Sequence, residues 1–223
     1  MRALLTADLD LSIPWFEWLI AKGWAFNLVC IAGDFLDLFN EEPKPKQVAQ
    51  VQGYLRDLAS KTNIALCSGN HDSFGPIVPA ARGPSYPWLV ELDNLPSVIS
   101  DGQTRIVGRL IVTTLPYCAN GEAKRILLDR GRSIRKSRGL KWLVLHHEPP
   151  PFLEPAGPGE REAKALIEEY LPDFWLSDHV HDCGAWNPAT TSRPMRPAGT
   201  PILPAILKFS SPQPPTAGHF DFL

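Results

Sequence analysis

The chain has 223 residues, 44% of them hydrophobic, and a formal net charge of −2. This length and apolar content suffice for one sizeable core, so we expect a single domain over residues 1–223. The nearly balanced charge gives no general attraction to nucleic acid or to an anionic membrane. No apolar run approaches the roughly 18 residues that a membrane-spanning helix needs.

Short apolar runs alternate with helical patterns in the first third of the chain. Residues 3–7, 27–33 and 63–69 have the apolar composition of short strands. Residues 13–24 and 45–60 have apolar side chains at helical spacing. This order of strands and helices predicts a parallel sheet with helices packed on its faces.

The second half of the chain has a different order of elements. Residues 104–117 indicate a strand hairpin that turns at Gly108. The further predicted elements are a helix at 121–138, a strand at 141–147, a helix at 160–171, and strands at 172–177, 202–210 and 218–223.

The cysteines and the N-terminus indicate the cellular compartment. Cys30, Cys67, Cys118 and Cys183 are isolated and form no CxxC pair, so we interpret them as reduced thiols. The N-terminal sequence MRALLTADLD has no long apolar stretch of the kind found in signal peptides. Both features predict a cytoplasmic protein.

Polar side chains follow the carboxyl end of each main predicted strand. In an open α/β sheet, residues beyond these ends converge on one crevice. The residues concerned are Asp8 and Asp10 after the first strand, Asp34 after the second, Asn70, His71 and Asp72 after the third, His146 after a later strand, and His179 and His181 after the next.

Seven of these side chains are candidate metal ligands: the carboxylates of Asp8, Asp10 and Asp34, the amide of Asn70, and the imidazoles of His146, His179 and His181. A single Zn²⁺ site uses about four protein ligands. Seven donors suit two ions about 3.5–4 Å apart, an arrangement that catalyses displacement at phosphorus. Oxygen and nitrogen donors without thiolate favour Mn²⁺, with Fe, Zn²⁺ or Mg²⁺ as alternatives.

The same motifs resemble those of the calcineurin-like metallophosphoesterases, whose pattern is D-x-H, G-D, G-N-H-D, a single His, and G-H-x-H. This chain has DLD, GD, GNHD, HHEPP and DHVH in that order over residues 8–181. The resemblance implies a four-layer α/β/β/α sandwich with two mixed central sheets, as in small bacterial members. It also implies metal-dependent hydrolysis of a phosphodiester or phosphomonoester, with nucleotide-like substrates favoured.

The resemblance further implies a role for each motif residue. Asp34 would bridge both metals, with Asp8, Asp10 and His181 on the first metal and Asn70, His146 and His179 on the second. A water that bridges the metals would attack phosphorus in line. His71, with Asp72 holding its ring, would protonate the leaving group. No cofactor other than the two metal ions is implied.

Two residues depart from the family pattern. Asp10 stands where the family has histidine, and three aspartates with one hydroxide balance the charge of two divalent ions. A more neutral site attracts a phosphate anion less strongly. Asp178 replaces the glycine before His179. These departures leave open a catalytically degenerate metal-binding or protein-binding module of the same fold.

Other residues have simpler interpretations. We expect His147 to be a packing or supporting residue, because its side chain points opposite to that of His146 if the strand continues. We interpret the basic residues in 124–141 as a solvated helix face. A small phosphoester substrate is therefore favoured over nucleic acid or a membrane, while a nuclease or a pyrophosphohydrolase remains the alternative enzyme.

Overall fold

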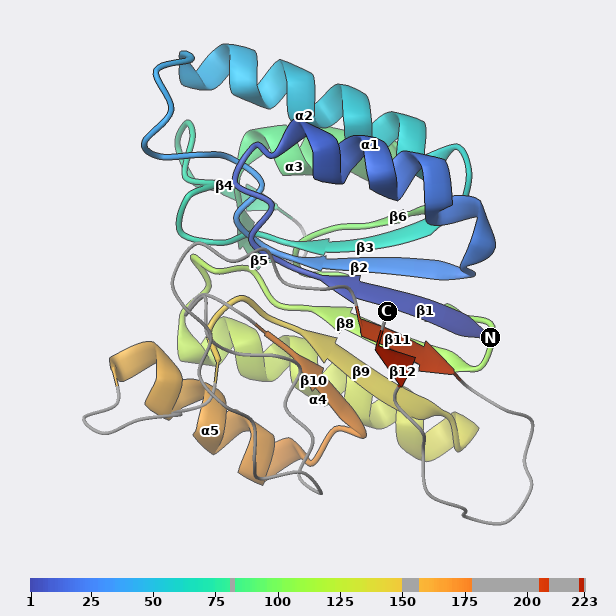
Figure 1. The fold of residues 1–223 in the computed structure, drawn as a ribbon. Helices are drawn as coiled ribbons and strands as arrows, with labels where there is room; N and C mark the ends of the chain where they lie inside the picture. The colour runs from blue at the N-terminus through green and yellow to red at the C-terminus, as the bar shows by residue number, and fades with distance from the viewer. Residues whose placement is uncertain (81–82, 150–156, 178–204, 209–220, 223) are drawn as a thin grey trace.

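A computed structural model describes residues 1–80, 83–149, 157–177, 205–208 and 221–222. Within these residues, two β-sheets pack face to face and helices cover their outer faces (Figure 1). No helix in this part of the chain has the length and apolar character needed to span a membrane.

The first sheet contains β1 (Arg2–Thr6), β2 (Leu28–Ala32), β3 (Asn63–Cys67), β6 (Val98–Ile99), β11 (Ala205–Lys208) and β12 (Asp221–Phe222). Its strand order is β12-β11-β1-β2-β3-β6. In this sheet β1, β2, β3 and β6 are parallel to one another. β11 runs antiparallel to β1, and β12 runs antiparallel to β11.

The second sheet has the order β10-β9-β8-β7, formed by β7 (Thr104–Val107), β8 (Leu110–Thr114), β9 (Lys141–Leu145) and β10 (Phe174–Leu176). β8, β9 and β10 are parallel, and β7 is antiparallel to β8. The predicted hairpin at Gly108 is confirmed, because this glycine lies between β7 and β8 with φ +58°. Left-handed φ values of this kind suit glycine.

Five α-helices are described: α1 (Ile13–Lys22), α2 (Lys44–Ala59), α3 (Pro87–Val90), α4 (Gly121–Arg138) and α5 (Pro158–Tyr170). Short 3₁₀ turns follow α1 at Gly23–Ala25 and α3 at Glu91–Asn94, and β4 (Val78–Ala80) pairs with β5 (Gly83–Ser85). α1, α2 and α3 lie on the first sheet, while α4 and α5 lie on the second (Figure 1).

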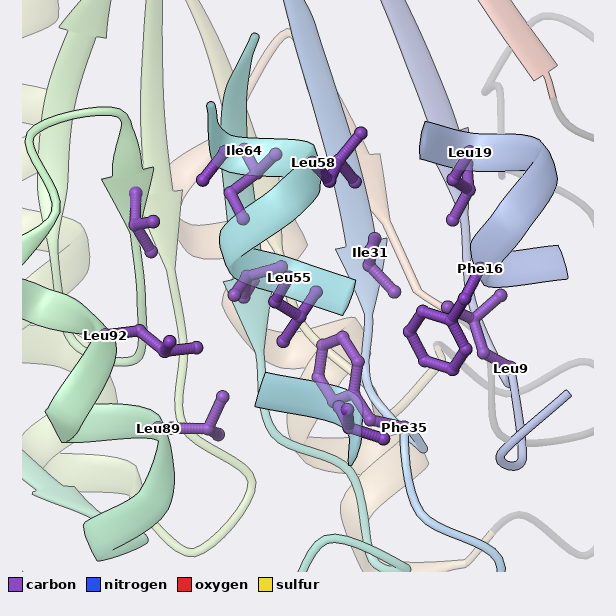
Figure 2. Packing of buried hydrophobic residues seen from close by; sticks show 14 of the residues in the cluster. Leu9, Phe16, Leu19, Ile31, Phe35, Leu55, Leu58, Ile64, Leu89 and Leu92 are labelled. Carbon is purple, nitrogen blue, oxygen red and sulfur yellow. The ribbon is translucent and has the colours of Figure 1, made fainter. Parts of the chain in front are cut away.

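Alternating side chains along each strand divide the core into three layers. Leu4 of β1 packs under the first helices, in the cluster that Figure 2 shows around Phe16, Ile31 and Leu55. Leu5, one residue later, packs between the two sheets. A third layer joins the second sheet to α4 and α5. The predicted four-layer α/β/β/α sandwich with two mixed sheets is therefore confirmed.

Candidate metal centre

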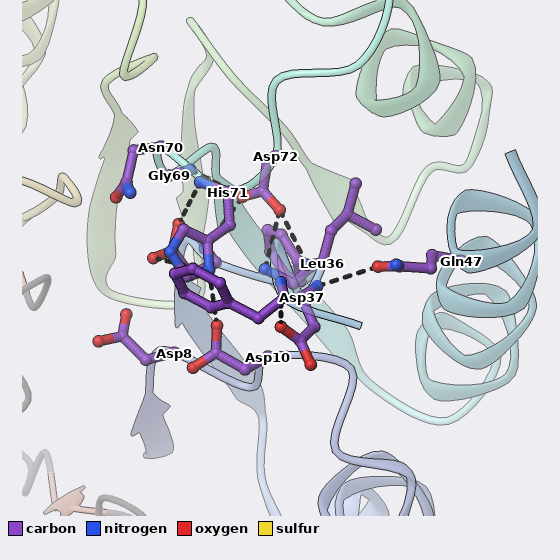
Figure 3. Close-up of polar contacts among 12 residues, drawn as sticks. Asp8, Asp10, Leu36, Asp37, Gln47, Gly69, Asn70, His71 and Asp72 are labelled. Atoms are coloured by element: carbon purple, nitrogen blue, oxygen red, sulfur yellow. Dashed lines mark hydrogen bonds and ion pairs between the residues drawn. The ribbon is translucent and has the colours of Figure 1, made fainter. Parts of the chain in front are cut away.

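The loops that follow β1 and β2 lie side by side and are joined through their backbones. The amide of Asp8 donates to the carbonyl of Gly33 at 3.1 Å, and the amide of Asp10 donates to the carbonyl of Asp34 at 2.9 Å. The loop after β3 joins them, because the amide of His71 donates to Oδ1 of Asp34 at 2.9 Å. Figure 3 shows Asp8, Asp10, Asn70, His71 and Asp72 gathered there. The sequence prediction that these strand ends converge is confirmed.

Three of the clustered aspartates have a left-handed backbone. The φ angles are 50° at Asp8, 42° at Asp10 and 52° at Asp34. Aspartate tolerates this region better than most residues, yet the conformation still costs free energy. The surrounding hydrogen bonds hold the strained backbone in place, and the carboxylates of Asp8 and Asp10 both lie near that of Asp34.

Two glycines make room for this cluster. Gly33 has φ +83°, and a Cβ at its position would lie 2.6 Å from Nδ1 of His147. A Cβ at Gly69 would lie 2.6 Å from the backbone nitrogen of Asp34. Both distances are too short for any larger side chain without movement of the backbone. The glycines in the GD and GNHD motifs are therefore needed for close packing of the loops.

One group of candidate ligands consists of Asp8, Asp34 and His147. The carbonyl of Ala32 lies 2.9 Å from Nδ1 of His147 and fixes the orientation of its ring. Nε2 then faces Oδ1 of Asn70 at 2.8 Å and Oδ2 of Asp34 at 3.4 Å. A backbone acceptor on one ring nitrogen is the usual way to aim the other nitrogen at a metal.

A second group consists of Asp10, Asp34 and His71. Nδ1 of His71 lies 2.9 Å from Oδ1 of Asp10 and 3.8 Å from Oδ2 of Asp34. Asp34 is 2% exposed and is the member that both groups share. Among the described residues, Asp34 is thus the carboxylate that both candidate ligand groups use.

The structure places His147 in the cluster in place of His146, which corrects the sequence prediction. β9 alternates, so that Leu143 and Leu145 face the other sheet while Trp142 and Val144 face the helices. His146 continues the helix-facing series, and its ring packs edge-on against Trp175 with centroids 5.8 Å apart. His147 continues the inward series and so reaches Asp34.

Asp72 also has a different contact from the predicted one. Its carboxylate accepts backbone N–H groups of Asp34, Phe35, Leu36 and Gly69 at 2.7–3.1 Å. The ring of His71 is instead held by Asp10. Asp72 is fully buried and links the GD loop to the GNHD loop, so its role in the fold is to position both loops (Figure 3).

Burial and close charges shift the protonation of the cluster. Burial opposes ionisation of Asp34, but His147 and His71 together lower its pKa. Burial disfavours the charged form of His147, yet Asp34 and Asp8 raise its pKa to about 9. Burial and the charge of Asp34 raise the pKa of Asp72 to about 8, against the backbone donors that favour its carboxylate. His147 and Asp34 therefore form a buried ion pair in the metal-free protein.

The sequence reading missed Lys44 at the start of α2. Its Nζ donates to the carbonyl of Asp37 at 3.2 Å and to that of His71 at 3.3 Å. The amide of Asp37 in turn donates to Oε1 of Gln47 at 3.0 Å (Figure 3). These contacts tie the loop after Asp34 to the loop that carries His71. Their partners are backbone carbonyls, so no sequence motif signals them.

The donor set of the cluster fits divalent metal ions. Within each of the two groups, the ligand atoms lie within 4.8 Å of one another. Ligands that bind one ion at about 2.0–2.2 Å lie closer together than this limit, so only small side-chain shifts are needed. Carboxylate, amide and imidazole donors without sulfur are typical of manganese, iron or zinc centres in phosphoesterases.

The remaining predicted site residues fall outside the described part of the chain. These are the proposed ligands His179 and His181, together with Asp178 before them. The described residues thus contribute Asp8, Asp10, Asp34, Asn70, His71 and His147 to the cluster.

The comparisons with known proteins agree with this fold. The family model of the calcineurin-like phosphoesterases matches residues 5–183, and the chain therefore belongs to this family of metal-dependent phosphoric ester hydrolases. No curated protein sequence matches the chain significantly.

Solved structures show the same fold at low sequence identity. A crystal structure of TT1561 of Thermus thermophilus is 14% identical, with a TM-score of 0.56, over 79% of this chain and 80% of that one. A second crystal structure is 11% identical, with a TM-score of 0.55, over 92% of this chain and 94% of that one. YfcE, a phosphoesterase from E. coli, is 21% identical over half of this chain with a TM-score of 0.29, too low to support an argument.

Proposed function

We propose that this protein is a phosphoesterase that uses two divalent metal ions to hydrolyse a phosphodiester or phosphomonoester, with nucleotide-like substrates favoured. The observation that carries the proposal is the position of Asp34 between two candidate ligand groups. When bound, the ions supply a water acidic enough to attack phosphorus at neutral pH. Mn²⁺ is the proposed metal, and Fe, Zn²⁺ and Mg²⁺ are the alternatives.

Each residue of the cluster has a proposed task. Asp34 would hold both ions. By the family pattern Asp8 and Asp10 would hold the first and Asn70 and His147 the second, whereas in the metal-free protein the ligand atoms group as Asp8 with His147 and Asp10 with His71 around Asp34. The family pattern also implies that His181 would complete the ligands of the first ion and His179 those of the second. His71 donates a proton to the departing oxygen, and Asp10 orients its ring through Nδ1. Family membership supports this division, and the described contacts support a place for Asp8, Asp10, Asp34 and His147 in the cluster.

The surface of α4 favours a small substrate over nucleic acid. Arg125 pairs with Glu169, and Arg132 pairs with Asp129. Arg135 and Lys141 both pair with Asp173. Basic side chains that already have acidic partners are less available to bind a phosphate backbone.

The proposal also includes a single domain and a cytoplasmic location, the latter supported by the free thiols of Cys30 and Cys67.

A phosphoester panel tests the proposed function directly. The purified protein is loaded with Mn²⁺ and assayed with bis(4-nitrophenyl) phosphate, 4-nitrophenyl phosphate, a dinucleoside pyrophosphate and single-stranded DNA. We expect turnover of at least one nitrophenyl ester, and a large loss of that turnover in Asp34→Asn. No turnover by a protein that holds two metal ions would instead favour the degenerate binding module. Preferential cleavage of the pyrophosphate or the DNA would favour the alternative enzymes.

A further inference from the structure

An exposed aromatic ring stands next to the proposed proton donor. Phe39 is 87% exposed, and its ring lies edge-on to the imidazole of His71, with centroids 6.1 Å apart. Leu38 beside it is 45% exposed. Because folding normally removes large apolar side chains from water, two adjacent exposed ones beside a reactive group indicate a contact with a ligand.

The loop that carries Phe39 is held in place by polar contacts. The amide of Phe39 donates to Oδ1 of Asp37 at 2.8 Å, and the amide of Asp37 donates to Gln47. Nε2 of Gln47 donates to the carbonyl of Glu42 at 2.8 Å, and Lys44 bonds the carbonyls of Asp37 and His71. Gln47 is 1% exposed, so it anchors both ends of the loop from inside the protein. The exposed ring is therefore attached to a fixed backbone.

On the basis of the proposed function, we infer that Phe39 is a specificity-determining residue that stacks on a planar aromatic ring of the substrate. The ring belongs to the group bonded to the oxygen that His71 faces, and it is either a nucleobase or an aryl group. Aromatic rings gain from stacking with little dependence on the identity of the partner ring. A phosphoester with a purely aliphatic alcohol has no surface for this contact.

Competitive inhibition separates recognition of a ring from recognition of phosphate. The Mn²⁺-loaded protein hydrolyses bis(4-nitrophenyl) phosphate while AMP or ribose 5-phosphate is added as inhibitor. Stacking on one base is worth about 1–3 kcal/mol, which corresponds to roughly 5- to 150-fold in affinity. We expect Phe39→Ala to leave the inhibition constant of ribose 5-phosphate unchanged and, where the ring is a nucleobase, to raise that of AMP about tenfold.

The two possible ring types give different patterns of change. If the ring is a nucleobase, Phe39→Ala raises the inhibition constant of AMP more than it raises the KM of the nitrophenyl ester. If the ring is an aryl group, the KM of the nitrophenyl ester rises about tenfold while the inhibition constant of AMP changes little. Phe39→Trp should retain binding, and Phe39→Leu should lose it because leucine has apolar area without a flat face. Trp24→Ala is the matched control, since Trp24 is 72% exposed but lies in the turn after α1.

Two results would overturn the inference. One is an unchanged KM and an unchanged AMP inhibition constant in Phe39→Ala. The other is a fall in kcat with unchanged KM for every substrate, which would assign Phe39 to the positioning of His71. Failure of the proposed function itself looks different, because the wild type would then show no turnover. In that event, calorimetric titration of AMP and of 4-nitrophenyl phosphate into the Mn²⁺-loaded wild type and Phe39→Ala still tests recognition of the ring, and equal affinity of the two proteins for both ligands overturns it.

Discussion

Oδ1 of Asp10 lies 2.9 Å from Nδ1 of His71, so the aspartate that departs from the family motif contacts the imidazole of the GNHD motif. The side chain of His71 is 13% exposed and that of Asp10 is 29% exposed. A carboxylate on Nδ1 fixes the ring tautomer and leaves Nε2 as the nitrogen that can reach a substrate. Asp10 thus combines a candidate metal oxygen with an oxygen that orients the proposed acid.

This contact predicts that Asp10→Ala reduces turnover about 100-fold, within the usual contribution of a positioned general acid. Asp10→Asn keeps an acceptor oxygen for Nδ1, and we expect a loss of only about tenfold. The reduction should be larger for a phenyl ester than for a 4-nitrophenyl ester, since the poorer leaving group depends more on protonation. Equal losses on both esters would show that Asp10 does not act through His71.

We expect opposite effects on metal binding when His146 and His147, which are adjacent in the sequence, are replaced. His147→Ala removes an imidazole next to Asp34, and we expect it to lose at least one bound metal ion per chain. His146→Leu changes a buried ring that packs on Trp175, and its pKa is lowered well below the usual value mainly by burial. A neutral buried ring can be replaced by an apolar side chain at a cost of about 1–2 kcal/mol.

Metal content by mass spectrometry, measured with thermal unfolding, tests this pair. The expected result is wild-type metal content in His146→Leu and reduced content in His147→Ala. Loss of metal from the folded His146→Leu variant alone would restore the original assignment from sequence.

Replacement of Asp72 should lower the free energy of unfolding strongly. Asp72→Ala leaves four backbone N–H groups without their acceptor, and a buried unsatisfied group costs about 1–3 kcal/mol. We expect a loss of at least about 3 kcal/mol in the free energy of unfolding, measured by urea denaturation. Asp37→Ala is the control, because Asp37 accepts one exposed amide and should cost below about 1 kcal/mol. Similar effects of both variants would contradict the positioning role of Asp72.

The His147–Asp34 pair predicts a pH dependence of the metal-free protein. The folded pKa of His147, about 9, is above its ordinary value near 6.5. The stability that protonated His147 contributes to the folded protein is therefore fully present below about pH 6.5 and is lost as the pH rises through about 9. The contribution is at most about 3 kcal/mol, and it belongs to the pair with Asp34, so the lowered pKa of Asp34 adds nothing separate.

Urea unfolding of chelator-treated protein between pH 6 and pH 9.5 measures this effect. His147→Gln is the reference, because it removes the titrating imidazole of His147 and keeps every other titrating side chain of the protein. We expect the advantage of the wild type over His147→Gln to shrink as the pH rises. A constant or growing difference would contradict the ion pair.

Much of the fold follows from local patterns in the sequence. The alternation of short apolar runs with helical spacing predicted the helices at 45–60 and 121–138, which the structure places at Lys44–Ala59 and Gly121–Arg138. The strand-end carboxylates were predicted because parallel strands deliver their ends to one edge. These inferences depend on local periodicity and on topology, both of which the sequence carries.

The predictions that were wrong concern the directions of individual side chains, which tertiary contacts determine. For two adjacent histidines after a strand, only the pleat decides which one faces inward, and Leu143 and Leu145 were the available signal for His147. The contact between Asp72 and His71 was carried over from the family pattern, and in this chain the neighbouring side chains of the turn point in different directions. Lys44 binds backbone carbonyls across a loop, and no residue pattern specifies such contacts.

Anomalous diffraction from crystals soaked in Mn²⁺ tests most directly whether Asp34 lies between two metal ions. We expect two manganese peaks about 3.5–4 Å apart with a carboxylate oxygen of Asp34 bound to both, and the loss of at least one peak in Asp34→Asn. A single peak, or two peaks remote from Asp34, would contradict it.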